Sequence, residues 1–143
     1  MAARAEELLS VLGLADAAGT LVVDYSQGMR KKVGLAGALL HAPRVLFLDE
    51  PFESVDPVSA RTLRSVLERH LHGGGTVVFS SHVMELVERL CDRVAVVHDG
   101  RLVASGRLDD VRGDDSLEDA FVRLVGGEVE QGGGLEWLGT SSD

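Results

Sequence analysis

The sequence predicts an α/β fold with a helical segment first, then parallel strands joined by crossover helices, and finally a β-hairpin. Two short apolar runs, 45–48 (VLFL) and 76–79 (TVVF), are each followed by a stretch whose apolar residues have helical spacing. This alternation of strand and helix favours parallel strands with right-handed crossovers. An Asp-Gly pair at 99–100 lies between two β-type runs and indicates a type I′ hairpin.

Two helices are expected before the first strand. The segment 5–14 (AEELLSVLGL) is amphipathic, and its apolar residues on one helical side are Leu8, Leu9, Val11 and Leu12. A second helix runs from about Met29 to Pro43, where it stops because proline cannot continue a helix. Ser26 stands at the position of an N-cap, whose hydroxyl accepts a hydrogen bond from a free amide of the first turn.

The strand 45–48 is expected to be buried and to lead into a helix over 58–71. The apolar residues of this helix that we expect to face the core are Leu63, Val66, Leu67 and Leu71. Three glycines at 73–75 then turn the chain into the second buried strand, 76–79. The spacing of apolar residues over 83–90 predicts the next helix.

The C-terminal part is expected to hold a hairpin over 94–104 and a short helix in SLEDAFVRLVGG, residues 116–127. Residues 126–143 are rich in glycine and acids, so we expect a disordered tail there. The sequence therefore divides into three parts: a helical segment over 1–43, a strand-and-helix core over 44–125, and the tail.

The charge distribution limits the possible partners. The chain carries a formal net charge of −9 at pH 7, and residues 109–143 hold ten acids but two arginines. The remainder is nearly neutral and has no basic face for non-specific binding of DNA or RNA. Its apolar runs are far shorter than the roughly 20 residues that cross a bilayer, and acids interrupt the start where a signal peptide is apolar. A cytosolic protein without a nucleic-acid partner is expected.

Acidic and imidazole side chains follow the two predicted strands. Asp49 and Glu50 follow the first and His82 the second, and the carboxyl ends of parallel strands are where such sheets bind ligands. Asp49 can hold Mg²⁺ through an oxygen or a water, while Glu50 can orient or deprotonate an attacking water. Acids after a strand also cap a turn, here enforced by Pro51, and for Asp49, Glu50 and Pro51 taken alone that interpretation is at least equally strong.

Four motifs in a fixed order make the sequence similar to ABC-type ATPases. The signature region, Walker B motif, D-loop and switch-histidine strand of that family are resembled by 24–43 (DYSQGMRKKVGLAGALLHAP), 45–51 (VLFLDEP), 54–57 (SVDP) and 77–82 (VVFSSH). The family signature is commonly written LSGGQ, and residues 25–29 (YSQGM) keep its serine and second glycine. That variant, followed by basic residues, looks like the ATPase subunits of ABC-2-type exporters. The resemblance extends from about residue 6 to residue 124 and implies a partial P-loop NTPase domain.

The resemblance also implies roles for individual residues. The family's contacts to the γ-phosphate of an ATP held by a second subunit fall on Ser26, Gln27, Gly28 and Met29. Taken alone, a serine and a glycine before a helix are an ordinary cap, but the start of a helix also favours an anion. By resemblance Asp49 binds Mg²⁺, Glu50 activates water, His82 contacts the γ-phosphate and Asp56 communicates across the dimer. ATP and Mg²⁺ are the implied cofactors, and a second ATPase subunit and membrane-spanning permease subunits at the inner face of the cell membrane are the implied partners.

A phosphate-binding P-loop reads GxxxxGK[ST], but these residues contain no Gly-Lys pair. The chain therefore resembles the C-terminal half of an ABC ATPase domain without its Walker A motif. One possible function is a part of an exporter ATPase that hydrolyses ATP in complete form but is inactive in isolation. Another is a non-catalytic module that lends its signature residues in trans to a complete subunit. A third is a related chromosome-maintenance or repair ATPase, although the hairpin and the SLEDAF ending resemble the transporter proteins.

Overall fold

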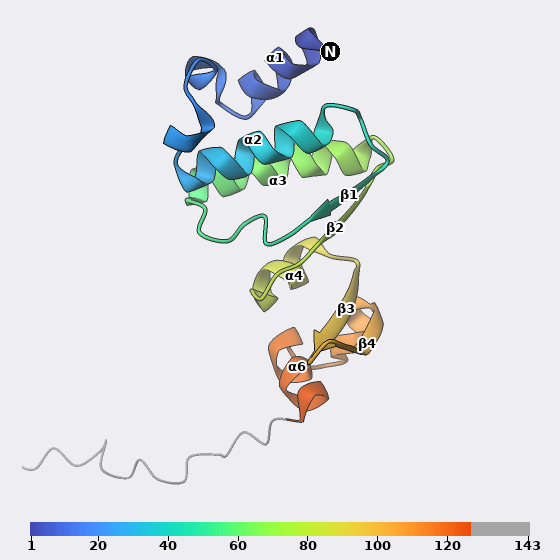
Figure 1. The fold of residues 1–143 in the computed structure, drawn as a ribbon. Coiled ribbons are helices and arrows are strands. Elements are labelled where there is room, and N and C mark those ends of the chain that lie inside the picture. The colour runs from blue at the N-terminus through green and yellow to red at the C-terminus, as the bar shows by residue number, and fades with distance from the viewer. Residues whose placement is uncertain (127–143) are drawn as a thin grey trace, which may run out of the picture. The chain divides into compact units, whose positions relative to one another are not determined.

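The computed structural model describes residues 1–126, and every helix and strand that the sequence predicts within them is present (Figure 1). The helices and strands are α1 (Ala2–Val11), α2 (Gln27–Leu39), β1 (Val45–Leu48), α3 (Pro57–His72), β2 (Thr76–Phe79), α4 (Met84–Leu90), β3 (Arg93–His98), β4 (Arg101–Arg107), α5 (Leu108–Arg112) and α6 (Leu117–Val125). Helix α5 and two 3₁₀ turns, Ala15–Ala17 and Val22–Asp24, were not expected from the apolar pattern. The tail expected over 126–143 lies outside the described residues except for Gly126.

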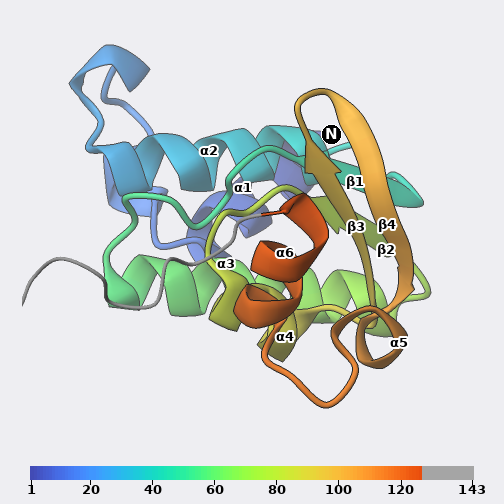
Figure 2. The same ribbon diagram turned by 90° about the horizontal axis from the view of Figure 1, so that it is seen from below.

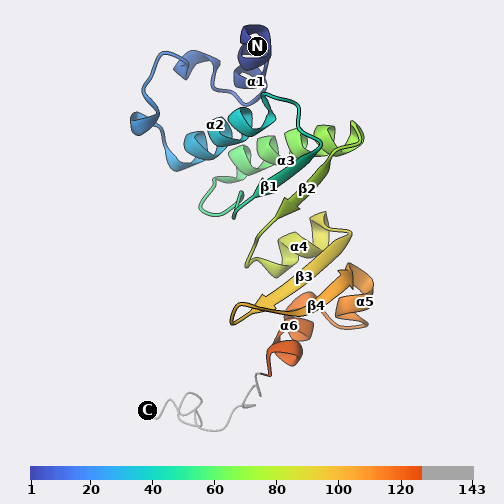
Figure 3. The ribbon, with the colours of Figure 1, turned by 45° about the vertical axis from the view of Figure 1, so that its right-hand side comes forward.

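Internal contacts divide the chain into two compact units, residues 1–82 and the residues from Val83 onward. The three-part division expected from the sequence, with a first boundary at 43–44, stays a prediction. In the first unit α2 and α3 lie side by side, and β1 and β2 run next to each other (Figure 3). Within residues 1–126 the helices are too short or too polar to cross a membrane.

The core of the first unit is a cluster of buried apolar side chains from its helices, its turns and β1. Its members are Leu12, Leu14, Tyr25, Leu35, Ala36, Leu46, Leu63, Val66 and Leu67. The expected inward positions of Leu63, Val66 and Leu67 are thus confirmed. The same expectation is wrong for Leu71, which is 45% exposed. Leu71 lies in the last turn of α3, where the apolar side of the helix extends past the packed segment.

β1 and β2 form a parallel pair, with Val45 opposite Thr76 at one end and Leu48 opposite Phe79 at the other. Helix α3 makes the crossover between them, as expected. The expected burial of both strands is only half right. Leu46 is buried, but Val45, Phe47 and Val78 are 45%, 77% and 46% exposed. Side chains of a strand alternate between two faces. An entirely apolar strand therefore predicts burial of both faces, although here only the face of Leu46 is packed against the core. We call Val45, Phe47 and Val78 the apolar sheet face.

The glycine run after α3 is a tight turn, as expected. Gly74 has φ 84°, a left-handed conformation that favours glycine. At Gly75 a Cβ atom would lie 2.2 Å from Nε2 of His70, so the ring of His70 occupies the space of a side chain. The amide of Thr76, which follows, donates to the carbonyl of Arg44 at 2.8 Å and starts β2 in register with β1.

The second unit is built on the hairpin of β3 and β4 (Figure 2), in which His98 pairs with Arg101. The two loop residues, Asp99 and Gly100, have φ of 47° and 71°, which confirms the type I′ turn. Ser116 is the N-cap of helix α6, with its Oγ accepting a hydrogen bond from the amide of Asp119, and Gly126 follows the helix in a left-handed conformation. These capping residues explain why the last helix could be located from the sequence.

Candidate functional site

Three polar residues meet at the carboxyl ends of β1 and β2. Asp49 and Glu50 follow β1, and Ser80 follows β2. The hydroxyl of Ser80 donates to Oδ1 of Asp49 at 2.6 Å and accepts a hydrogen bond from the amide of Glu50 at 2.9 Å. The amide of Ser80 donates to the carbonyl of Leu48 at 3.0 Å. The parallel pairing therefore brings the two acids to one serine from the neighbouring strand.

Glu50 has an unusual backbone for a residue with a side chain. Its φ is 42°, in the left-handed region, where Cβ crowds the following carbonyl. Its amide is held by Ser80, and its carbonyl accepts hydrogen bonds from Nζ of Lys31 on α2 and from the amide of Glu53. The backbone of Glu50 is therefore fixed on both sides.

The carboxylate of Glu50 pairs with His82. Oε1 of Glu50 lies 3.0 Å from Nδ1 of His82, and the two side chains are 27% and 65% exposed. The hydrogen bond to Glu50, supported by the charge of Glu50 and the more distant charge of Glu53, raises the pKa of His82. The pair is therefore open to solvent at the strand ends, where a carboxylate can accept a proton and an imidazole can donate one.

Asp49 is the residue at this edge with the chemistry of a magnesium ligand. Mg²⁺ in nucleotide sites is held by one or two carboxylates together with phosphate oxygens and waters. Among residues 1–126 no cluster of three or more His, Cys, Asp or Glu side chains could hold a metal ion. Asp49 is exposed and has Oδ1 bonded to Ser80. One carboxylate is too few ligands for a metal ion held by protein alone, but it suits a Mg²⁺ ion whose other ligands are phosphate oxygens and waters.

The predicted signature residues form the first turn of α2 and its cap. Oγ of Ser26 accepts a hydrogen bond from the amide of Met29 at 3.2 Å, which confirms the expected N-cap. Gln27 begins the helix, and the side chain of Met29 packs against the core. Gly28 is buried, and a Cβ atom at this position would lie 3.3 Å from Oδ2 of Asp56. The structure thus brings Gly28 and Asp56 together at one helix end.

Asp56 itself is the N-cap of α3. Its Oδ1 accepts hydrogen bonds from the amides of Val58 and Ser59 at 3.0 and 2.9 Å. These bonds, with that of Ser59 the largest cause, lower the pKa of Asp56. A structural role as a helix cap is therefore present beside the role in dimer communication that the resemblance implies.

Tyr25 begins the signature-like stretch but lies inside the protein. It is 4% exposed, and its hydroxyl donates to the carbonyl of Ala17 at 2.8 Å. Its own carbonyl accepts a hydrogen bond from Nε of Arg30 at 2.9 Å. Tyr25 therefore anchors the loop before α2 to the core.

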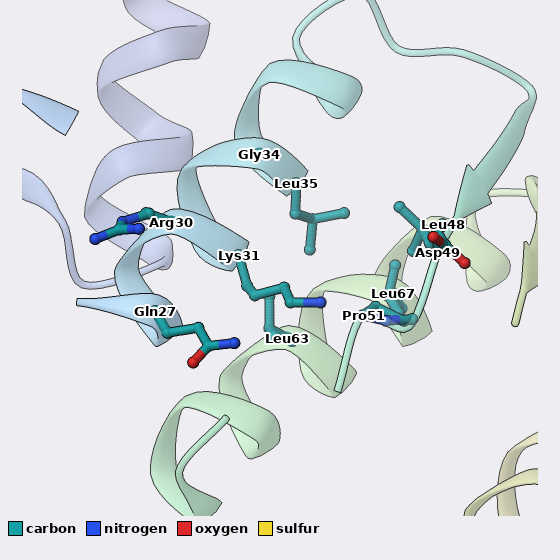
Figure 4. A pocket seen from close by; sticks show the side chains of 10 residues that line it. All are labelled: Gln27, Arg30, Lys31, Gly34, Leu35, Leu48, Asp49, Pro51, Leu63 and Leu67. Carbon is teal, nitrogen blue, oxygen red and sulfur yellow. The ribbon is translucent and has the colours of Figure 1, made fainter. Parts of the chain in front are cut away.

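A mostly apolar pocket of about 280 Å³ lies beside Asp49 (Figure 4). Its walls come from α2, α3 and the end of β1, namely Gln27, Arg30, Lys31, Gly34, Leu35, Leu48, Asp49, Pro51, Leu63 and Leu67. Sequence reasoning missed Lys31 and Ser80 as parts of the site. Lys31 lies in the basic run 30–32 and Ser80 in the stretch 77–82 (VVFSSH), but neither pattern indicates a contact with Glu50.

Comparisons with known proteins identify relatives of this chain. Residues 16–88 match a family model described as "AAA domain, putative AbiEii toxin, Type IV TA system". An uncharacterized ABC transporter ATP-binding protein from Nostoc sp. is 41% identical over 77% of this chain and 33% of its own length. A fluoroquinolones export ATP-binding protein from Mycobacterium tuberculosis is 45% identical over 68% of this chain and 33% of its own length. The chain thus spans about a third of these curated relatives.

A solved structure described as the ATP binding subunit of an ABC transporter superposes with a TM-score of 0.78. It is 30% identical in sequence, and the match covers 86% of this chain and 55% of that one. The motifs on which the resemblance rested lie within the residues 16–88 that the family model matches. The chain therefore belongs to the family of ABC transporter ATP-binding proteins and carries part of their P-loop-type ATPase domain.

Proposed function

We propose that this chain is the part of an exporter ATPase that supplies the water-activating carboxylate and the signature residues, and that the complete domain couples ATP hydrolysis to export. The observation that carries the proposal is the meeting of Asp49, Glu50 and His82 at the ends of two parallel strands. This is the edge at which open α/β sheets bind ligands.

The three residues have separate tasks in this proposal. Asp49 holds Mg²⁺ through Oδ1, Oδ2 or an intervening water, and the ion neutralises charge on the phosphates when bound. Glu50 orients the attacking water and takes its proton at a carboxylate oxygen. His82, hydrogen-bonded to Glu50, keeps that carboxylate in place and directs its other ring nitrogen, Nε2, to the γ-phosphate.

The start of α2 serves a second nucleotide in the same proposal. Ser26, Gln27, Gly28 and Met29 cap a helix of 13 residues, whose first amides and dipole attract an anion. We assign this end to the γ-phosphate of an ATP held by a second ATPase subunit. Asp56 lies against Gly28, so a contact across the dimer at Asp56 would also reach the signature residues.

The printed name of one relative, the fluoroquinolones export ATP-binding protein, supports export as the direction of transport. A bacitracin transport ATP-binding protein from Enterococcus faecalis, 40% identical over 68% of this chain, supports transport without giving a direction. In the complete assembly we place the ATPase at the cytoplasmic face of the membrane, bound to separate membrane-spanning subunits.

One feature supports a second candidate function. The 143 residues contain no GxxxxGK[ST], so this stretch offers no P-loop lysine or amide cradle for the β- and γ-phosphates. A chain that cannot hold its own ATP can still lend Ser26 and Gly28 to the ATP of a complete subunit. In that case it acts as a binding module without catalysis of its own.

The experiment that separates the two candidates uses a completed domain, in which this chain is joined to a segment carrying GxxxxGK[ST] from an ABC transporter ATP-binding protein. Phosphate release from Mg-ATP by the completed domain supports the first candidate. For the second, the isolated chain is mixed with a complete subunit whose own signature serine has been replaced by arginine. Restored hydrolysis in that mixture supports lending in trans. A completed domain that folds and binds Mg-ATP without hydrolysing it would contradict the first candidate.

A further inference from the structure

We propose that Lys31 and Ser80 are positioning residues that together hold the backbone of Glu50 in its left-handed conformation, so that its carboxylate faces His82. The inference rests on the proposed function, in which Glu50 activates water. Lys31 lies in the signature-like stretch 24–43 and Ser80 in the switch-histidine stretch 77–82, but the resemblance assigned neither of them a contact with Glu50.

The conformation of Glu50 needs such support. A residue with a side chain at φ 42° is strained, and strain of this kind persists only where surrounding contacts determine it. Three other described residues with side chains, Ala42, Ser54 and Asp99, also have positive φ; Ala42 and Ser54 lie in loops, and Asp99 lies in the hairpin turn between β3 and β4. At Glu50 the left-handed backbone directly follows Asp49 and turns the chain at the edge of the sheet.

Ser80 fixes the amide side of Glu50. Its hydroxyl proton is donated to Oδ1 of Asp49 at 2.6 Å, which leaves an oxygen lone pair for the amide of Glu50 at 2.9 Å. A hydroxyl has one proton. Because Ser80 donates this proton to Asp49, its oxygen can act only as an acceptor toward the amide of Glu50. Ser80 therefore orients Asp49 and Glu50 at the same time.

Lys31 fixes the carbonyl side. Its side chain leaves α2 toward Pro51, along the wall of the pocket beside Asp49 (Figure 4), and Nζ donates to the carbonyl of Glu50. Charged donors make stronger hydrogen bonds than neutral ones. Because Lys31 and Ser80 come from α2 and from the end of β2, the peptide units on both sides of Glu50 are held by separate elements.

The geometry can be measured directly in the 143-residue chain. A residue with positive φ has a short distance between its own amide and α protons, and gives a strong intraresidue NOE. In selectively ¹⁵N-glutamate-labelled chain that carries Phe47→Thr to limit self-association through the apolar sheet face, we expect this strong NOE for Glu50 and its loss when Lys31→Met or Ser80→Ala is added. Lys31→Arg and Ser80→Thr keep the donors and should restore it. Lys32→Met removes the neighbouring charge and should leave it unchanged.

A kinetic measurement on the completed domain shows whether the positioning matters for hydrolysis. Lys31→Met should lower kcat roughly 10- to 100-fold with KM for Mg-ATP nearly unchanged, because a misplaced base affects the transition state more than binding. Retention of the strong NOE in both Lys31→Met and Ser80→Ala would overturn the inference. Loss of the NOE with unchanged kcat would support the clamp and reject Glu50 as the base, so the two failures are distinguishable. If Ser80→Ala does not fold, Lys31→Met alone decides.

Discussion

At the scale of single residues, Glu50 carries the most specific expectation. In the completed domain, Glu50→Gln should bind Mg-ATP while hydrolysis falls by roughly 10² to 10⁴, the usual contribution of a general base. The reason is that an amide keeps the hydrogen bonding of the side chain but cannot take a proton from water. Turnover and nucleotide binding are measured separately on the same preparation.

The matched control for this change is Glu53→Gln. It removes the same charge three residues further on, where the side chain of Glu53 is exposed. The backbone amide of Glu53 donates to the carbonyl of Glu50, and this bond does not involve either carboxylate. Its turnover should stay within about threefold of native. An equal loss in both variants would mean that local charge, and not the carboxylate of Glu50, supports hydrolysis.

The pairing of Glu50 with His82 predicts a pH dependence of stability. The hydrogen bond to Glu50 raises the pKa of His82 above its ordinary 6.5, so protonated His82 is favoured in the folded chain. The stabilisation is complete below the ordinary pKa and is lost as the pH rises through the raised value. The effect should be small, because His82 is 65% exposed.

Thermal midpoints at pH 6 and pH 8 check this expectation in native chain, His82→Gln, Glu50→Gln and the double variant. The coupling between the two substitutions should be larger at pH 6 than at pH 8. A coupling that is equal at both pH values, or larger at pH 8, would contradict the pairing.

At the scale of elements, the first turn of α2 is held against the first turn of α3. Gly28→Ala would place a Cβ atom 3.3 Å from both Oδ2 of Asp56 and Oγ of Ser59. Asp56 would have to shift from the amides that it caps, so we expect a loss of about 0.5–2 kcal/mol in the free energy of unfolding. Denaturant unfolding measures it.

Gly37→Ala is the control on the same helix. Nothing lies within 4 Å of a Cβ atom at Gly37, so alanine should raise the free energy of unfolding by about 0.5–1 kcal/mol through its higher helix propensity. If Gly28→Ala lowers the free energy of unfolding and Gly37→Ala raises it, the loss at Gly28 is due to the contact with Asp56. Two similar stabilisations would show that Gly28 has room for a side chain.

The elements were predictable where local chemistry defines them. Ser26 and Ser116 cap their helices, and Asp99-Gly100 forms its turn, because each of these depends on neighbouring residues alone. The acids and the histidine at the strand ends were found for a similar reason, since parallel pairing brings strand ends together. The roles of Lys31 and Ser80 could not be predicted, because each depends on the side-chain geometry of residues 19 and 30 positions from Glu50.

At the scale of the whole molecule, the apolar sheet face should make the isolated chain self-associate. Within residues 1–126, β1 pairs with β2 alone, which leaves its other edge open as well. Exposed apolar strands of this kind pair with other chains. We expect sedimentation to show oligomers at micromolar concentration and isothermal calorimetry to show very weak binding of Mg-ATP.

Phe47→Thr should reduce this association, because it removes the largest exposed side chain of the face, while threonine is β-branched and suits a strand. Leu102→Thr is the control, since Leu102 is 63% exposed on the hairpin of the second unit. We expect that a neighbouring segment is needed to cover the apolar sheet face and to bind the nucleotide. A native chain that stays monomeric at high concentration, or that binds Mg-ATP at micromolar concentration, would contradict this.

The exposed face of β1 and β2 also has a consequence for the life of this polypeptide in a cell. Chaperones and proteases select chains by the apolar surface that those chains present while unpartnered. With Phe47 77% exposed, copies made without a segment or partner over that face would be bound and degraded until something covers it. The steady-state amount of such copies would then follow the supply of the covering partner and not their own rate of synthesis.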